Sequence, residues 1–189
     1  MQFKEIEYKY DGASLEMQKF VDLMETFSIK KKMMVSSYDD YFVDTAGNFI
    51  RYRYTDGRGE LTIKRKLSEK NNNERIEVNV PTAGDNLKTV TAFVDLLGYK
   101  HNFGIYKTCK IYWIDKSVIV YYVVYDKDLK ELRRFVEIEA DEDLQWNSEE
   151  EAWEEIAKYE KLLEPLGITP KNRLKKSLFE IFRKNSSAS

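Results

Sequence analysis

Residues 3–10 read FKEIEYKY, and this alternation of charged and apolar side chains predicts a β-strand. Residues two apart on a strand share a face, so Glu5, Glu7 and Lys9 form one charged row. The apolar residues between them form the opposite row, which needs a hydrophobic core. Taken alone, this pattern is also typical of an ordinary strand that has one solvent-exposed face and no functional role.

The pattern is informative because it recurs. Charged residues alternate with apolar ones at Arg51 and Arg53, Lys64 and Lys66, Arg75 and Glu77, and Glu137 and Glu139. Eight strands are predicted, over residues 3–10, 32–44, 49–55, 60–66, 74–80, 105–114, 118–126 and 134–140. Short turn signals separate several neighbours, which favours hairpins and an antiparallel sheet.

Helical periodicity appears in four segments, residues 14–27, 85–97, 148–163 and 171–182. Ser148 followed by Glu151 is a capping-box pattern at the start of the third. The expected fold class is α+β, a closed antiparallel eight-stranded β-barrel with helices packed outside, because closure leaves no exposed sheet edge. Residues 1–185 are expected to form a single domain, and residues 186–189 a disordered tail.

Composition narrows the function classes. The 189 residues carry a net charge of −2, so nothing global indicates nucleic-acid binding or a membrane surface. One cysteine, Cys109, and one histidine, His101, exclude an internal disulfide and zinc sites built from thiolates or imidazoles. The sequence has no apolar run long enough to span a bilayer and no signal-peptide core, which predicts a cytoplasmic protein.

Closure of the sheet would bring the charged rows together in one lumen. The cations expected there are Lys9, Arg51, Arg53, Lys64, Lys66, Arg75 and Lys107, and the carboxylates are Glu5, Glu7, Glu77, Glu137 and Glu139. Crowded cations are costly to desolvate unless a polyanion fills the space, and a triphosphate supplies one. The carboxylates would repel that anion unless they hold Mg²⁺ or Mn²⁺, hard cations that bridge carboxylate and phosphate oxygens.

Several stretches of the sequence together resemble a known family, the triphosphate tunnel metalloenzymes or CYTH superfamily. The matching stretches, in order, are Glu5 to Lys9 (EIEYK), residues 38–45 (YDDYFVDT), residues 49–53 (FIRYR), residues 61–66 (LTIKRK), residues 75–77 (RIE) and residues 135–139 (FVEIE). The superfamily groups class IV adenylyl cyclases, thiamine triphosphatases and inorganic tripolyphosphatases, with fungal-type RNA triphosphatases more distant. The resemblance covers about residues 3–140, and the later helices also suit the family.

The resemblance implies a role for each matching residue. It implies metal binding by Glu5, Glu7, Glu137 and Glu139, with Glu77 either a ligand of a second metal or part of an ion pair. It implies phosphate binding by Lys9, Arg51, Arg53, Lys64, Lys66, Arg75 and Lys107, and catalytic roles for Glu5, Glu7 and Lys9. The chain departs from the family pattern at Cys109, which stands where a phosphate-binding arginine is often found.

Other conspicuous residues receive structural interpretations. Cys109 is expected to be a buried thiol rather than a nucleophile. An aromatic group on the later strands is expected to pack outside against helices rather than stack a purine; it comprises Tyr106, Tyr112, Trp113, Tyr121, Tyr122 and Tyr125.

Three functions are compatible with these features. The first is metal-dependent hydrolysis of inorganic tripolyphosphate, a nucleoside triphosphate or thiamine triphosphate. The second is cyclisation of ATP to cyclic AMP and pyrophosphate, and the third is a non-catalytic polyphosphate- or nucleotide-binding module. Residues 1–4 read MQFK and lack the His-Phe-x-Gly lead-in common in class IV cyclases, which favours hydrolysis. The expected partner is a triphosphate-containing small molecule, without membrane or nucleic acid, bound by a monomer or homodimer.

Overall fold

A computed structural model describes the backbone of residues 3–68, 71–83 and 86–183, and their side chains except at 3–5, 64–68, 71–76 and 83. Within these ranges the chain forms eight strands, β1 (Phe3–Asp11), β2 (Ile29–Val43), β3 (Phe49–Thr55), β4 (Arg58–Ser68), β5 (Asn71–Ala83), β6 (Lys100–Ile114), β7 (Ser117–Tyr125) and β8 (Glu131–Ala140). The helices are α1 (Met17–Met24), α2 (Leu87–Leu96), α3 (Glu149–Leu163) and α4 (Leu178–Phe182), with 3₁₀ turns η1 (Glu164–Leu166) and η2 (Pro170–Asn172).

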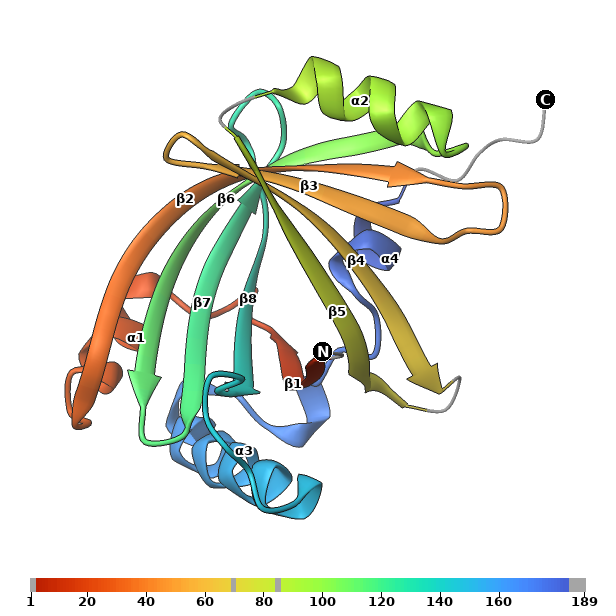
Figure 1. Cartoon of the computed structure of the whole chain (residues 1–189). Helices are drawn as coiled ribbons and strands as arrows, with labels where there is room; N and C mark the ends of the chain where they lie inside the picture. The colour runs from red at the N-terminus through yellow and green to blue at the C-terminus, as the bar shows by residue number, and fades with distance from the viewer. Residues whose placement is uncertain (1–2, 69–70, 84–85, 184–189) are drawn as a thin grey trace.

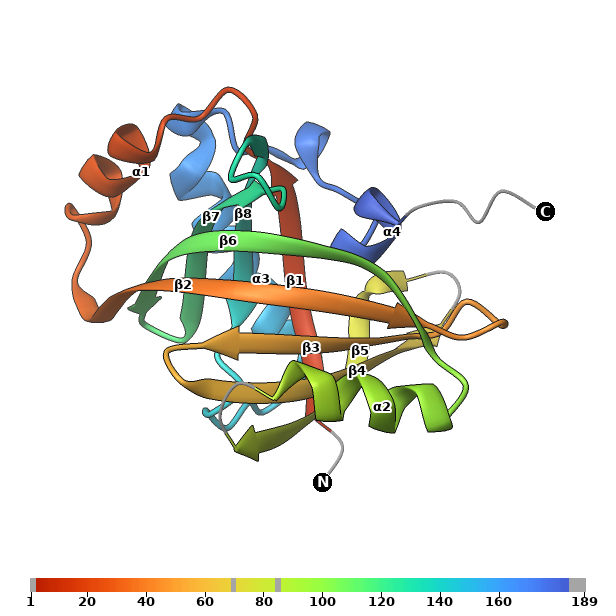
Figure 2. The ribbon, with the colours of Figure 1, turned by 90° about the horizontal axis from the view of Figure 1, so that it is seen from above.

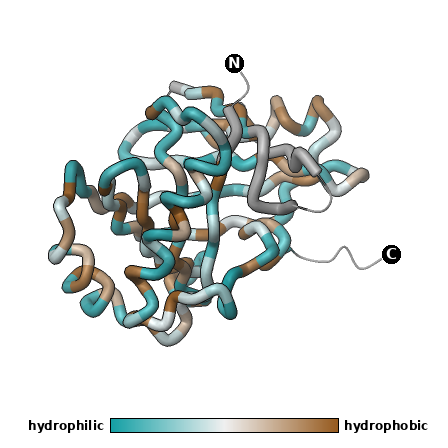
Figure 3. Tube along the Cα trace, turned by 90° about the horizontal axis from the view of Figure 1, so that it is seen from below, coloured by the Kyte–Doolittle hydropathy of each residue, from teal (hydrophilic) through white to brown (hydrophobic). Residues whose placement is uncertain are grey.

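The strands form one antiparallel sheet in which every strand pairs with two others (Figure 1). The strand order is that of a closed barrel, β1-β5-β4-β3-β2-β6-β7-β8, with β1 paired to β5 through its first half and to β8 through its second. The expected α+β class and the eight antiparallel strands are therefore confirmed. Hydrophilic and hydrophobic residues alternate along much of the chain (Figure 3), as a sheet with one apolar face requires.

Hairpin turns set the register of neighbouring strands. Asp56 and Gly57 both adopt positive φ, 47° and 78°, and join β3 to β4 as a two-residue turn. Such turns match the twist of the strands that they connect. The register that follows places Arg53 opposite both Asp39 and Glu60. Charged residues from three strands therefore lie in one row across the sheet.

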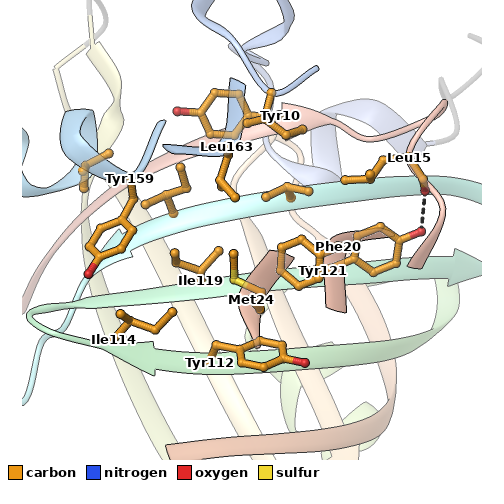
Figure 4. Close-up of a cluster of buried hydrophobic side chains, with 14 of the residues drawn as sticks. Tyr10, Leu15, Phe20, Met24, Tyr112, Ile114, Ile119, Tyr121, Tyr159 and Leu163 are labelled. Carbon is orange, nitrogen blue, oxygen red and sulfur yellow. Dashed lines mark hydrogen bonds between the residues drawn. The ribbon is translucent and has the colours of Figure 1, made fainter. Parts of the chain in front are cut away.

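The largest hydrophobic cluster lies outside the sheet, beneath α1 and α3 (Figure 4). Phe20 of α1 packs against Tyr112 and Tyr121, and Tyr121 donates a hydrogen bond from its hydroxyl to the backbone oxygen of Leu15 at 2.8 Å. A second outer cluster packs Val90 and Val94 of α2 against strands β2 and β3. The helices that were predicted outside the sheet are thus located there.

A further apolar cluster lies on the inner side of the sheet, where α4 packs. Phe179 of α4 stacks on Phe49 with ring centroids 4.5 Å apart, and its ring also lies near Phe103 and Tyr41. Figure 2 shows α4 at the opposite end of the sheet from α1. The C-terminal part of the described chain therefore covers one end of the space that the strands surround.

The three helices predicted over residues 14–27, 85–97 and 148–163 are confirmed as α1, α2 and α3. The fourth, predicted over residues 171–182, is wrong in part. At the start of α3 the Ser148 hydroxyl accepts a hydrogen bond from the backbone N–H of Glu151 at 3.2 Å, as the capping pattern predicted. Residues 171–182 instead form the end of η2, an isolated β-bridge from Arg173 to Tyr10, and the short α4. Arg173 also pairs with the buried Glu160 of α3, so contacts with other elements replace a continuous helix. The expected tail, residues 186–189, lies outside the described residues.

Within the described chain, no helix combines the length and the apolar character needed to cross a membrane.

Candidate functional site

A cavity of about 380 Å³ lies inside the sheet and receives a side chain from every strand. One lining residue for each strand, in chain order, is Lys9, Tyr41, Arg51, Glu60, Glu77, Lys107, Tyr122 and Glu137. Arg53 and Glu139 also line it. Because residues two apart share a face, the charged rows read from the sequence converge on this interior as predicted.

One wall is built around Lys9, which lies between two carboxylates. Its ammonium pairs with Glu137 and lies 3.4 Å from an oxygen of Glu7. Register explains this contact, because Lys9 is the direct partner of Glu137, and Glu7 that of Glu139, across β1 and β8. The Tyr122 hydroxyl donates to Glu137 at 2.8 Å, and burial together with that carboxylate raises the pKa of Tyr122 well above its usual value. Lys9 and Tyr122 thus hold Glu137 in a fixed orientation.

A second wall is organised by Asp39, a residue that the sequence reasoning did not assign to the site. Asp39 is fully buried and accepts two hydrogen bonds from Arg53, at 2.8 and 3.0 Å. The ammonium of Lys107 lies 2.7 Å from the same carboxylate. Two cations therefore share the carboxylate of Asp39.

Burial and charge act in opposite directions on this group. Burial disfavours ionised Asp39, but Arg53 and Lys107 outweigh it and hold the pKa of Asp39 well below its usual range. Burial and the like charge of Arg53 lower the pKa of Lys107, and Asp39 opposes that shift. Asp39 thus offsets part of the effect of burial and of Arg53 on the charged form of Lys107.

Arg51 is the cation with the loosest ion pairing among the described side chains of the cavity. Its guanidinium donates to the Thr62 hydroxyl at 2.8 Å, but the oxygens of Glu60 and Glu77 lie 3.6 and 3.8 Å away. Its Nε is buried and has no hydrogen-bond acceptor among the described residues. Arginine binds oxyanions through paired N–H groups, so this side chain has donor capacity left for a ligand.

The donor types in the cavity suit a hard divalent cation. Glu7, Glu137 and Glu139 lie on adjacent strands and line the same cavity, and oxygen ligands are those that Mg²⁺ and Mn²⁺ prefer. Among the described side chains, however, no three His, Cys, Asp or Glu residues are gathered closely enough to hold a metal ion. One oxygen of Glu137 already contacts Lys9, so binding there requires that ion pair to rearrange.

Most of the predicted site residues can be placed. The cavity is lined by Glu7, Lys9, Arg51, Arg53, Glu77, Lys107, Glu137 and Glu139. The side chains of Glu5, Lys64, Lys66 and Arg75 lie outside the described residues, although their strands are present. Backbone register pairs Arg75 with both Glu5 and Lys66, and Lys64 with Glu77. For these four residues even the position of the side chain stays a prediction, and for all twelve the assigned metal-binding, phosphate-binding and catalytic roles stay predictions.

The aromatic prediction is correct for some residues and wrong for others. Tyr112 and Tyr121 belong to the outer cluster beneath α1 and α3 as expected, whereas Trp113 and Tyr122 line the cavity. The spacing of Trp113 from Lys107 could have predicted this position. The two residues lie six apart on β6, and residues an even number apart on a strand point to the same face. Cys109 also lines the cavity, and burial raises the pKa of its thiol, which agrees with an unreactive cysteine.

Comparison with known proteins shows the fold at low sequence identity. No family model matches the chain, and no curated protein matches it by sequence. A conserved hypothetical protein from Pyrococcus furiosus shares 23% identity at a TM-score of 0.71, covering 93% of this chain and 98% of that one. A "putative adenylate cyclase" from Vibrio parahaemolyticus shares 13% sequence identity at a TM-score of 0.64, covering 95% of this chain and 97% of that one. A chain in the structure of the Schizosaccharomyces pombe Mediator head module shares 11% sequence identity at a TM-score of 0.65, covering 86% of this chain and 95% of that one.

These likenesses establish a shared fold, which hosts more than one function. They are consistent with the resemblance to the triphosphate tunnel metalloenzymes.

Proposed function

We propose that the cavity is a triphosphate tunnel in which a divalent metal ion and the basic side chains bind a triphosphate, and that water attacks a phosphorus atom of that substrate. The observation that carries this proposal is that all eight strands contribute to one interior cavity in which arginine and lysine side chains lie among carboxylates, the groups that bind phosphate oxygens and a divalent metal ion. Arg53 and Lys107 share one carboxylate, and Arg51 lacks an acceptor for its buried Nε among the described residues. A polyanion supplies the missing acceptors.

The chain's own residues account for binding and orientation. Arg51, Arg53 and Lys107 would contact phosphate oxygens, and Asp39 would hold two of them in place. Glu7, Glu137 and Glu139 would hold Mg²⁺ or Mn²⁺, with Glu5 expected to complete the set. The metal, when bound, neutralises charge on the phosphate oxygens. Lys9 would keep Glu137 aligned until the metal competes for it, which fits a role for Lys9 at the reacting end of the substrate.

Cyclisation of ATP is a second candidate, because the fold is shared with a structure described as an adenylate cyclase and the same walls would hold the same three phosphates. The two reactions differ in the attacking oxygen, which is water in one and the ribose 3′-hydroxyl in the other. Trp113 and Tyr122 line the cavity beside the charged walls, where an aromatic base could stack.

One experiment separates the candidates. The protein is incubated with Mg²⁺ or Mn²⁺ and, separately, with tripolyphosphate, ATP or thiamine triphosphate, and the products are resolved. We expect orthophosphate from at least one substrate. Formation of cyclic AMP and pyrophosphate from ATP would identify the protein as a cyclase instead of a hydrolase. Tight binding of a substrate without any product would identify a non-catalytic binding module.

The Glu139→Gln variant tests the metal assignment. It retains the shape of the side chain but loses the charge that a divalent cation requires, so turnover should fall to background and should not recover at high metal concentration. Glu16→Gln is the matched control, because Glu16 is exposed and lies outside the cavity. Full activity of Glu139→Gln would contradict the assignment.

A further inference from the structure

Four tyrosines lie side by side on the outer face of the sheet, away from the cavity. Tyr54 is the register partner of Tyr38, Tyr38 that of Tyr106, and Tyr106 that of Tyr125, so the row crosses β3, β2, β6 and β7. Neighbouring strands are about 4.8 Å apart, which brings such side chains into contact. The rings of Tyr38 and Tyr106 have centroids 4.6 Å apart, inclined at 49°. The row is an aromatic strip across four adjacent strands.

The strip forms the floor of a second cavity of about 540 Å³. Its ends are bounded by the β3–β4 turn, at Asp56 and Gly57, and by Leu129 of the β7–β8 turn. Figure 2 shows these two turns on either side of β2 and β6. Tyr106 is 39% exposed, so the floor of this outer hollow is accessible from outside.

Leu129 adds an independent observation at the rim. It adopts a φ of 60°, a left-handed conformation that costs a non-glycine residue about 1 kcal/mol or more. Asp126 fixes this turn, because its side chain accepts hydrogen bonds from the backbone N–H groups of Asp128 and Lys130, both at 2.9 Å. The strained leucine is nevertheless 66% exposed, so burial does not repay the strain. Retained strain of this kind is common at binding sites.

Charge decides which ligand suits the hollow. Two charged residues line it, Asp56 and Lys107, but the ammonium of Lys107 lies 2.7 Å from Asp39 on the inner side of the sheet. Arg58 and Lys130 follow the two turns and do not line the hollow. What a ligand meets is therefore four tyrosine side chains, whose ring faces carry partial negative charge, three residues with aliphatic hydroxyls and the carboxylate of Asp56. This surface attracts cations and repels phosphates.

We propose that the outer hollow binds an alkylated ammonium ion, held by cation–π contacts with the tyrosines and by the charge of Asp56. A methylated ammonium suits the site better than a plain one because its alkyl groups pack on the apolar floor and its charge is less strongly hydrated. The site is separate from the triphosphate tunnel and does not depend on the activity proposed for it.

The test is a titration of the full chain with choline, followed by NMR shifts or calorimetry, alongside 3,3-dimethylbutanol, which has the same shape without the charge. We expect saturable choline binding and at least about tenfold weaker binding of the neutral compound, consistent with a desolvated cation–π contribution. Tyr106→Leu should weaken choline binding about tenfold, and Asp56→Asn several-fold. Tyr99→Leu is the control, because Tyr99 packs against the outer cluster beneath α2 and lies outside the hollow.

Three results would overturn the proposal. Equal affinity for the neutral compound would show that the hollow is merely hydrophobic, and unchanged binding in Tyr106→Leu would place choline elsewhere. Absence of saturable choline binding, with binding of single-stranded RNA that Tyr106→Leu abolishes, would identify the strip as a base-stacking surface instead. The Tyr106→Leu variant is expected to fold because the Tyr106 side chain is partly exposed. Asp56→Asn, in the β3–β4 turn, tests choline binding independently of Tyr106.

Discussion

Asp39 shows how one buried side chain can determine the charge of a whole wall. Its carboxylate contacts Arg53 and Lys107 at hydrogen-bonding distance, and no part of its surface is exposed. Without it, two like charges would face each other in a poorly solvated space. Under the proposed function, a ligand that brings its own negative charge would compete with Asp39 for both cations.

The pKa of Asp39 predicts how acid affects the fold. Its folded pKa lies below the ordinary value of 3.8, so its stabilising contribution is complete above about pH 4 and is lost as the pH falls further. Asp39→Asn should therefore lower the free energy of unfolding at pH 7 by roughly 3 kcal/mol, the cost of leaving buried cations unpaired. The variant should also show a shallower loss of stability below pH 4.

Urea unfolding at pH 7, 5, 4 and 3 measures both effects. Asp128→Asn is the control, because the Asp128 side chain is 75% exposed. Parallel stability curves for Asp39→Asn and the unmodified protein between pH 4 and 3 would show that Asp39 does not carry this linkage.

Residue-level prediction succeeded where alternation alone was sufficient. Glu7, Lys9, Arg51 and Glu137 were placed inside because a period of two fixes the face of a strand. Asp39 was not assigned, because its importance depends on the register that brings it opposite Arg53. Register depends on turn geometry and on tertiary pairing, which the alternation pattern does not contain.

At the scale of elements, the segment after α3 differs most from its prediction. Its helical periodicity is real, but η2 and the bridge between Arg173 and Tyr10 interrupt it, and only α4 forms a helix there. Local propensity is a weak prior when tertiary contacts compete with it. Arg173 pairs with Glu160 and lies over the ring of Tyr8, 3.7 Å from its centroid, so the bridge is held on two sides.

The packing of α4 predicts the consequence of truncating its central aromatic residue. Phe179 is 3% exposed and stacks on Phe49, so Phe179→Ala should lower the free energy of unfolding by about 3–4 kcal/mol. Leu162→Ala on α3 is the control, because Leu162 is 39% exposed and should cost much less. Chemical denaturation measures both values. A loss below about 1 kcal/mol for Phe179→Ala would mean that α4 does not seal the inner cluster.

At the scale of the whole molecule, the ring of strands brings together residues that are far apart in the chain. Lys9 of β1 meets Glu137 of β8 because the first and last strands pair. Each charged row is ordinary by itself, and the common interior brings their cations and carboxylates into one cavity. The same ring leaves an outer face between its helices, which is where the aromatic strip lies.

Under the proposed function, a ligand that binds the cations of this interior together with Mg²⁺ should stabilise the entire fold. Tripolyphosphate with Mg²⁺ at about 100 times its dissociation constant should add about 2.7 kcal/mol, which corresponds to a rise of roughly 5–10 °C in the midpoint of thermal unfolding. Orthophosphate at matched ionic strength should give a smaller shift, because a single phosphate offers fewer oxygens and less charge than three linked phosphates. Arg51→Gln should reduce the tripolyphosphate shift, since it removes the guanidinium with the loosest ion pairing in the described cavity. Equal shifts from both anions, or an undiminished shift in Arg51→Gln, would mean that the stabilisation arises from general ionic effects at the surface rather than from binding inside the sheet.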